Sequence, residues 1–222
     1  MNTTAPTDTN VARASRLDTT SLSDALDRLG IAGHCLNIKP LEWTFLMTGR
    51  AYTILYGPSA TPSGTVGDYI DDVAPGSVIV LDNGGRENAT VWGDILTWVA
   101  TRKGIAGTVI DGACRDTRLA RELGYPIFSR SYSMRTGKDR VQVEGVNGVV
   151  NIGDARVAAG DILRGDADGV LAIPRAHEDA VLAAAEEIDA TEQKIRALIN
   201  EGRSLANARR ELGYHSLQSR RK

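Results

Sequence analysis

Residues Trp92 to Asp116, WGDILTWVATRKGIAGTVIDGACRD, carry the strongest structural signal in the sequence. The first half of this stretch, Trp92 to Lys103, spaces apolar residues three and four apart, which predicts an amphipathic helix that stops at Gly104. Gly107 to Asp111 is a short apolar run and predicts a buried strand. A helix of about 10 residues rises about 15 Å, and a strand of about 5 residues returns about 16 Å. The two ends of the stretch should therefore meet.

This path places Asp94 beside Arg115 and Asp116, at the carboxyl edge of a parallel strand where open α/β sheets bind ligands. Carboxylates suit Mg²⁺, which keeps several waters and takes one or two protein carboxylates. The Arg115 guanidinium matches a substrate carboxylate, and the first-turn N–H groups of Ile95 and Leu96 can hold another anionic oxygen. The cluster predicts a site for a metal-bound 2-oxo acid. The alternative is a helix cap at Asp94 and a surface ion pair between Arg115 and Asp116.

The sequence from Trp92 to Arg130 resembles the RraA-like family. Its Asp-X20-Arg-Asp pattern resembles that of the class II pyruvate aldolases that act on 4-hydroxy-4-methyl-2-oxoglutarate and 4-carboxy-4-hydroxy-2-oxoadipate. The resemblance runs from about Leu17 to about Ser204. It implies an α/β fold of the swivelling β/β/α type, a trimer or a dimer of trimers, and active sites between subunits.

The resemblance also implies roles for the cluster. Asp116 is expected to be the ligand of a divalent cation, Mg²⁺ or Mn²⁺, and Asp94 to hold a metal-bound water. Arg115 is expected to grip the pyruvyl part of the substrate, while the amides of Ile95 and Leu96 take its oxygens.

Two further site residues are expected at a distance from this cluster. The family's additional acidic residue comes from the neighbouring subunit, and Glu192 matches it, with Glu186 and Glu187 as alternatives on the same helix. The polar, glycine-bearing loop from Asp82 to Ala89 leads into the Asp94 helix, and glycine lets such a loop approach a ligand closely. Arg86 in this loop is the candidate for a distal substrate carboxylate, the alternative being an exposed arginine in a turn.

Composition limits the class of protein. The 222 residues, 42% of them hydrophobic, fit one domain with a sizeable core. A net charge of -2 and a pI near 6.0 argue against a nucleic-acid partner. Cys35 and Cys114 lie far apart, so neither a disulfide framework nor a zinc site is indicated. The sequence has no signal peptide and no membrane-length apolar run, so we expect a cytoplasmic protein without a membrane partner.

The chain divides into a mobile N-terminal arm (1–16), the RraA-like aldolase domain (17–204) and a C-terminal tail (205–222). Asp68, Asp71 and Asp72 are interpreted as solvated helix surface. Outside the central stretch, periodicity and turn residues predict helices from Thr20 to Gly30, Asp116 to Leu123 and His177 to Glu201, and strands at Thr48–Tyr56, Ser77–Leu81 and Pro126–Ser129.

These observations favour a metal-dependent lyase that cleaves a 4-hydroxy-2-oxo acid to pyruvate and a second carbonyl product. Oxaloacetate decarboxylation is an expected side reaction, because it passes through the same enolate. The alternative from another class is a non-catalytic regulator of ribonuclease activity with the same fold. Members of that branch often lack the aspartate after the arginine, so Asp116 favours the enzyme. A third possibility is an enzyme of this fold with a different hydroxy-acid substrate.

Overall fold

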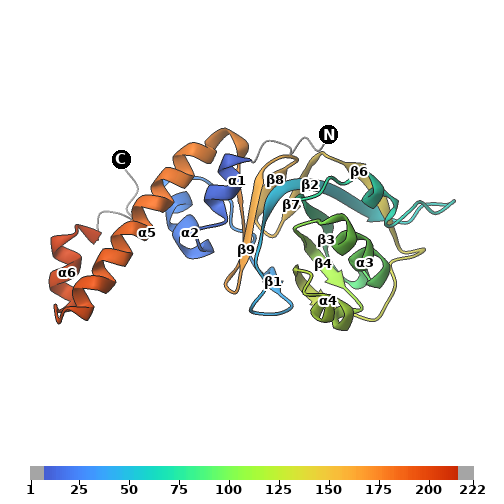
Figure 1. Cartoon of the computed structure of the whole chain (residues 1–222). Coiled ribbons are helices and arrows are strands. Elements are labelled where there is room, and N and C mark those ends of the chain that lie inside the picture. Colours follow the sequence, from blue (N-terminus) through green and yellow to red (C-terminus); the bar gives the residue numbers. More distant parts are fainter. Residues whose placement is uncertain (1–7, 215–222) are drawn as a thin grey trace, which may run out of the picture.

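The structure, a computed structural model, describes residues 8–214 and is a mixed α/β fold built around one large sheet (Figure 1). The sheet has the strand order β1-β5-β4-β3-β2-β9-β10, with β6 also paired to β2, while β7 and β8 form a separate hairpin. The strands are β1 (Lys39–Pro40), β2 (Met47–Pro58), β3 (Val78–Thr90), β4 (Gly107–Cys114), β5 (Ile127–Tyr132), β6 (Val141–Val146), β7 (Val149–Ile152), β8 (Ala155–Ala158), β9 (Ile162–Asp166) and β10 (Gly169–Ile173). The α-helices are α1 (Thr9–Ala14), α2 (Thr19–Leu29), α3 (Asp94–Lys103), α4 (Thr117–Leu123), α5 (Glu178–Asn200) and α6 (Leu205–Glu211), and the 3-10 helices are η1 (Asp68–Asp72) and η2 (Arg175–His177).

The core of the sheet is parallel: β2, β3, β4 and β5 pair side by side in one direction. Alternate residues of β3 face opposite sides, because side chains alternate along a strand. Ile79 and Leu81 pack in the cluster that includes residues of α3 and α4, while Val78 and Val80 pack in the cluster that includes β7 and β8. Both faces of the central strands are thus covered, which explains their continuous apolar sequences.

The out-and-back path predicted for residues 92–116 is confirmed. Helix α3 begins at Asp94 and ends at Gly104, which adopts the left-handed conformation (φ 68°) that favours glycine at a helix end. Strand β4 then returns beside β3 and is buried along its whole length to Cys114, beyond the predicted end at Asp111. Cys114 is a buried free thiol, and burial raises its pKa, so it is a packing residue.

Residues Asp82 to Ala89, predicted as a loop, instead form an irregular part of strand β3. β3 continues to Thr90, but its pairing with β4 shifts between Asp82 and Arg86. Gly84 and Gly85 have φ values of 59° and 69°, which allow the backbone to bulge there. The polar sequence is compatible with a strand because the bulge turns much of it towards solvent.

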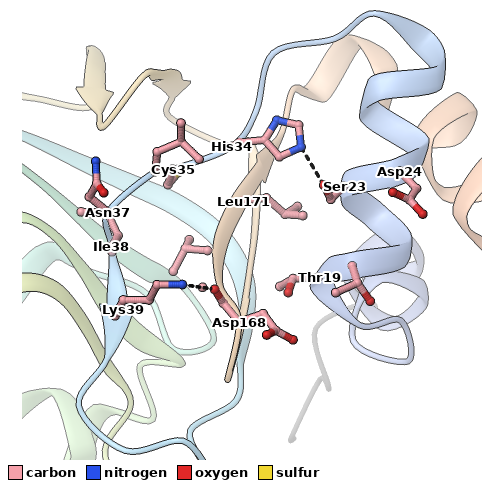
Figure 2. Close-up of a pocket in the computed structure, with 14 residues that line it drawn as sticks. Thr19, Ser23, Asp24, His34, Cys35, Asn37, Ile38, Lys39, Asp168 and Leu171 are labelled. Carbon is pink, nitrogen blue, oxygen red and sulfur yellow. Dashed lines mark hydrogen bonds between the residues drawn. The ribbon is translucent and has the colours of Figure 1, made fainter. Parts of the chain in front are cut away.

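A second layer lies over β9 and β10. Leu22 and Leu26 of α2 pack with Leu182 of α5 and with the adjoining strands. Figure 2 shows α2 beside the segment that carries His34, where the Ser23 hydroxyl lies 2.9 Å from the ring nitrogen Nε2. From this layer α5 runs outwards to α6, on the side of the molecule away from α3 and α4 (Figure 1).

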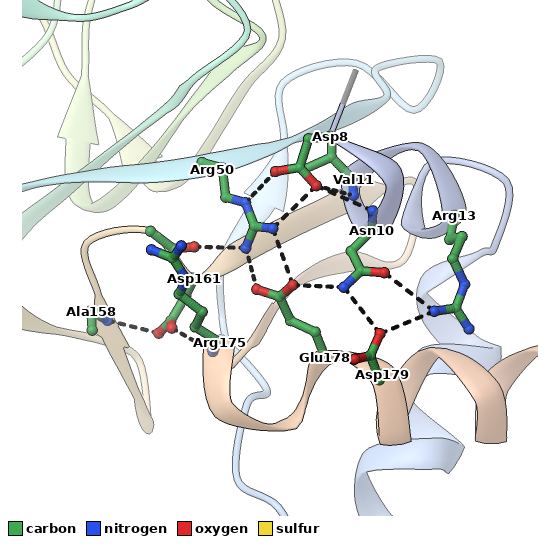
Figure 3. A network of polar contacts seen from close by, with 11 residues as sticks. Asp8, Asn10, Val11, Arg13, Arg50, Ala158, Asp161, Arg175, Glu178 and Asp179 are labelled. Carbon is green, nitrogen blue, oxygen red and sulfur yellow. Dashed lines mark hydrogen bonds and ion pairs between the residues drawn. The ribbon is translucent and has the colours of Figure 1, made fainter. Parts of the chain in front are cut away.

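Part of the arm predicted for residues 1–16 has regular structure, the helix α1, while residues 1–7 lie outside the described residues. Asp8 caps α1 and pairs with Arg50 of β2 through a 2.7 Å contact. Arg50 also contacts Glu178, which accepts a hydrogen bond of 3.0 Å from the Asn10 amide (Figure 3). These contacts lower the pKa of Asp8, chiefly through its hydrogen bond with Arg50. Local sequence missed them because all the partners are distant in the chain.

The predicted C-terminal tail also contains regular structure. Ser204 caps α6, accepting a hydrogen bond from the Asn207 N–H, and α6 folds back beside α5. The remainder of the tail, residues 215–222, lies outside the described residues. Within residues 8–214, no helix is both long enough and apolar enough to cross a membrane.

The buried Glu178 carboxylate, 6% exposed, should be a main anchor of the N-terminal helix. Glu178→Gln removes its charge while keeping its size, and leaves Arg50 with one carboxylate partner. We expect the free energy of unfolding to fall by about 1.5–3 kcal/mol, the range for hydrogen bonds to charged groups. Urea denaturation followed by circular dichroism measures this. Arg118→Ala is the control, since Arg118 is 90% exposed and its pair with Glu122 should have no measurable effect. Equal stability of both variants would contradict the anchor.

Candidate functional site

Backbone contacts join the two connections that carry the candidate site. The Arg115 N–H donates to the Trp92 carbonyl at 2.9 Å, just before α3 and just after β4. As a result the Asp94 N–H donates to Asp116 Oδ2 at 3.1 Å, and Arg115 Nε lies 3.3 Å from the same oxygen. The proximity of Asp94, Arg115 and Asp116 predicted from chain geometry is confirmed.

Asp116 has an unusual backbone conformation. Its φ and ψ of 55° and 35° are left-handed, which is uncommon for any residue other than glycine. Although it precedes α4 at the N-cap position, its side chain makes no capping hydrogen bond there. The carboxylate is turned instead towards Asp94 and Arg115. Such outliers cluster at functional sites, where surrounding contacts hold a side chain in place.

Gly93 provides the room for this arrangement. A Cβ at this position would lie 2.8 Å from Asp116 Oδ2 and 3.0 Å from Arg115 Nε. Its φ of -152° is open to any residue, so the need for glycine here is one of space. Sequence reasoning missed Gly93, because its role depends on side chains that come from the other end of the α3–β4 unit.

The first turn of α3 differs in part from the expectation of two free amides. The Ile95 N–H donates to Asp94 Oδ1 at 2.8 Å, so the neighbouring carboxylate takes it. The Leu96 N–H has no acceptor in the described part of the chain. This helix start has no side-chain cap from Gly93, which leaves a positive helix end facing the site.

A hollow of about 370 Å³ opens beside this cluster. Asp94 and Arg115 form part of one wall, and Leu96 and Trp92 supply apolar surface. The opposite side is formed by η1 and by the segment between β5 and β6. The residues that line it are Val66, Gly67, Asp68, Ile70, Asp71, Thr90, Val91, Trp92, Gly93, Asp94, Ile95, Leu96, Val99, Arg115, Thr136, Gly137 and Lys138.

The carboxylates of this site fit a loosely held, hydrated cation. Asp94 is exposed, and the side chain of Asp116 is 40% exposed, so both can keep water around a bound ion. Residues 8–214 hold no group of three or more histidine, cysteine, aspartate or glutamate side chains that could bind a metal. Two carboxylates are enough for Mg²⁺, which binds few protein ligands. They are too few for the closed four-ligand site of a structural zinc.

Arg86 lies elsewhere. Its Nη1 donates to the Asn83 carbonyl at 2.8 Å, within the bulge of β3, and it does not line the hollow. The acidic residues near it hold the β7–β8 hairpin: Asp82 accepts from the Asn151 N–H, and Asp111 from the Gly153 N–H, each at 2.8 Å. The structure therefore does not bring Arg86 together with Arg115.

Glu192 is also distant from Asp116 within one chain. It lies on α5 near its far end, and its carboxylate contacts Arg196 at 3.0 Å and the Tyr214 hydroxyl at 3.2 Å. Figure 1 shows that end of α5 on the opposite side of the molecule from α3 and α4. The two alternative residues on α5 form ion pairs within the chain: Glu186 pairs with Arg13, and Glu187 pairs with Arg28.

A second hollow, of about 270 Å³, lies between α2 and the turn of the β9–β10 hairpin (Figure 2). Lys39 Nζ donates to the Asp168 carbonyl at 2.6 Å on its wall. Burial raises the pKa of Cys35 to about 12, so this thiol stays protonated. Asp24 and Asp168 line this hollow, but no arginine among the described residues does, and no contact joins the two carboxylates as one joins Asp94 to Asp116. The α3 site is therefore the better candidate for catalysis.

Comparison with known proteins places these features in a family. The RraA-like family model (Aldolase/RraA) matches residues 19–172. A Halalkalibacterium halodurans protein named "Putative 4-hydroxy-4-methyl-2-oxoglutarate aldolase" is 34% identical over 177 residues, 80% of this chain and 82% of that protein. Protein DlpA of Legionella pneumophila is 40% identical over 196 residues, 87% of this chain, and the match spans only 32% of DlpA.

Solved structures agree with the fold. An uncharacterised protein from Pseudomonas syringae has a TM-score of 0.85 at 38% identity, covering 90% of this chain and 96% of that one. Streptomyces coelicolor RraAS2, described as an unusual member of the RNase ES inhibitor RraA protein family, has a TM-score of 0.79 at 25% identity, covering 86% and 97%. The names of the relatives support an aldolase at the level of the family. The chain belongs to the RraA-like family.

Proposed function

We propose that the protein is a divalent-metal-dependent aldolase that cleaves a 4-hydroxy-2-oxo acid, such as 4-hydroxy-4-methyl-2-oxoglutarate, to pyruvate and a second carbonyl product. The observation that carries the proposal is the convergence of Asp94, Arg115 and Asp116 beside one hollow. Relatives named as aldolases of this substrate add support. The left-handed conformation of Asp116 fits a side chain held for function rather than for packing.

The cluster divides into groups that hold a cation and groups that hold the substrate. Asp116, directly, and Asp94, through water, would hold Mg²⁺ or Mn²⁺. When bound, that cation supplies Lewis-acid polarisation of the substrate's 2-oxo group. The Arg115 guanidinium binds the adjacent carboxylate through two parallel hydrogen bonds. The Leu96 N–H donates a hydrogen bond to a further oxygen of the pyruvyl part, and the Ile95 N–H does the same when the Asp94 carboxylate turns away.

Cleavage requires a proton to leave one end of the breaking bond and another to reach the other end. A water held by the exposed Asp94 carboxylate takes the proton of the C4 hydroxyl as the C3–C4 bond breaks. The C4 oxygen becomes the carbonyl of the second product, and the bonding electrons pass to the pyruvate enolate. Arg115 and the α3 N-terminus stabilise this developing negative charge. The same water then returns a proton to C3, which yields pyruvate, and oxaloacetate decarboxylation would use the same enolate.

The acidic partner of this site is assigned to a neighbouring subunit. Glu192 lies on the far side of its own chain from Asp116, so it can take part only in an assembly, which we propose to be a trimer or a dimer of trimers. Exposed apolar residues next to the site support an interface there: Ile95 is 74% exposed and Trp98 51% exposed on α3. Glu192 of the partner subunit would share the water that moves the proton.

The alternative function is a non-catalytic regulator of ribonuclease activity, favoured by the likeness to RraAS2.

The deciding experiment offers 4-hydroxy-4-methyl-2-oxoglutarate and oxaloacetate to the purified protein and measures pyruvate release. We expect activity with Mg²⁺ or Mn²⁺, its loss in excess chelator, and recovery when the cation is restored, because few protein ligands hold the ion. Asp116→Asn should lower activity by orders of magnitude and keep the melting temperature. Full activity in chelator would contradict metal dependence, and no pyruvate at all would favour the regulator.

Gly93→Ala should disturb the candidate site without destabilising the fold. The added methyl group displaces the Asp116 and Arg115 side chains, which lie on short connections beside it, while its φ allows alanine. We expect pyruvate release to fall at least tenfold with little change in melting temperature. Gly148→Ala is the matched control, because a Cβ there meets nothing within 4 Å. Wild-type kinetics in Gly93→Ala would show that Asp116 and Arg115 need no fixed placement.

Mixed oligomers test the shared site. Asp116→Asn and Glu192→Gln should each be nearly inactive, because each damages every site of its own assembly. When the two variants are unfolded and refolded together, random mixing gives about a quarter of the sites both intact groups. Recovered pyruvate release near that fraction is the expected outcome. No recovery after subunit exchange verified by mass spectrometry would remove Glu192 from the site, and Glu187 would be the next residue to substitute.

A further inference from the structure

Helix α3 begins without a side-chain cap, although its first turn carries groups of the candidate site. A capping side chain at position 93 would accept a hydrogen bond from the second or third helical N–H, which belong to Ile95 and Leu96. These are the amides that the proposed reaction uses for the pyruvyl oxygens. Gly93 has no such side chain, so no cap competes with the substrate for them. Because helix ends fray, this first turn needs a different constraint.

A buried hydroxyl provides that constraint from the carbonyl side. The Thr97 hydroxyl donates to the Gly93 carbonyl at 2.9 Å, alongside the Thr97 N–H at 3.0 Å. The same hydroxyl accepts a hydrogen bond of 2.9 Å from Nε1 of Trp92. Thr97 is 0% exposed and does not line the hollow. The first turn of α3 is thus held by groups that leave its amides to a ligand.

Trp92 extends this constraint to the segment that carries Asp116. Its ring is 2% exposed and stacks on the ring of Tyr125, with 6.0 Å between the centroids and 5° between the planes. Tyr125 comes just after α4, so the stack fixes the far end of the helix that follows Asp116. On the other side of Asp116, the Arg115 N–H donates to the Trp92 carbonyl. Trp92 therefore holds both flanks of Asp116, and Thr97 holds Trp92 to α3.

We propose that Thr97 is a positioning residue for the reaction. Its hydroxyl, bonded to Trp92, fixes the direction of the Leu96 N–H without touching the substrate. This inference rests on the proposed function of the hollow, in which the Leu96 N–H faces a pyruvyl oxygen that gains charge as the C–C bond breaks. A preorganised donor is most effective where charge develops. Misplacing it should therefore slow the reaction more than it weakens substrate binding.

Replacing the hydroxyl by a methyl group tests this role. Thr97→Val keeps the volume of the side chain and removes its hydrogen bonds. We expect kcat for 4-hydroxy-4-methyl-2-oxoglutarate to fall about tenfold with KM within about twofold, because the donor is misplaced, whereas removing such a donor outright costs about 100- to 1000-fold. Thr97→Ser keeps the hydroxyl and should restore most of kcat.

Thr53→Val is the matched control. Thr53 is also 0% exposed, and its hydroxyl donates to a main-chain carbonyl, that of Gly148, at 2.6 Å. Its neighbours Tyr52 and Ile54 on β2 pack in the cluster that includes residues of α3, so Thr53 faces the other side of the sheet. Both valine variants should lose a similar amount of thermal stability, and only Thr97→Val should lose kcat.

Binding of oxalate and pyruvate tests the positioning without turnover. Oxalate is a planar dianion that matches the charge of the pyruvate enolate, whereas pyruvate has the ground-state charge. In calorimetry with excess Mg²⁺, Thr97→Val should bind oxalate about tenfold more weakly and pyruvate nearly as well as wild type. Equal weakening of both ligands, an unchanged kcat, or Thr97→Ser as slow as Thr97→Val would overturn the positioning role.

A failure of the aldolase proposal is distinguishable from a failure of this inference. If wild-type protein releases no pyruvate, the aldolase proposal fails. Hydrogen exchange of the N–H groups of residue 97 and Arg115 then decides whether Thr97 holds the two connections together. Exchange that is faster in Thr97→Val than in Thr53→Val is the expected result, and equal exchange would overturn the constraint.

Discussion

The candidate site depends on the contact that joins the end of β4 to the start of α3. The Arg115 N–H to Trp92 carbonyl bond brings two connections together, and the Asp94 N–H to Asp116 carboxylate bond then aligns their side chains. The first bond joins main-chain groups next to two rigid elements, and the second joins the start of α3 to a side chain, so the site is preorganised before a ligand arrives. Preorganised charge is effective in catalysis because little reorganisation is needed during the reaction.

This arrangement has a conformational cost that other parts of the structure offset. Asp116 adopts a left-handed backbone conformation, and position 93 must be glycine because the side chains of Asp116 and Arg115 occupy the space beside it. The helix α4 and the buried strand β4 flank Asp116 and hold it in this conformation. An acidic residue in a left-handed conformation, packed against a glycine that has no room for a side chain, is therefore a more informative mark of this site than either carboxylate alone.

The proposed catalytic residues lie in two separate regions of the molecule. The parallel sheet carries the Asp94 cluster and the hollow, while α5 and α6 extend Glu192 away from them (Figure 1). Only the apolar face of α5 packs against the core of its own chain. The charged face of this long helix is therefore free to contact a second copy of the chain. The proposed assembly would join these regions between subunits.

The α3–β4 unit and the proximity of Asp94 to Arg115 and Asp116 are predictable from the sequence, because the rise per residue of a helix and of a strand sets where a short helix–strand path ends. The packing role of Gly93, the position of Arg86 in the β3 bulge and the ion pair of Asp8 with Arg50 emerge only in the tertiary structure. Each depends on groups far apart in the chain, and local periodicity carries no information about such contacts. The residue types indicated a site for a cation and an anionic substrate, whereas tertiary packing determines which charged side chains line the hollow.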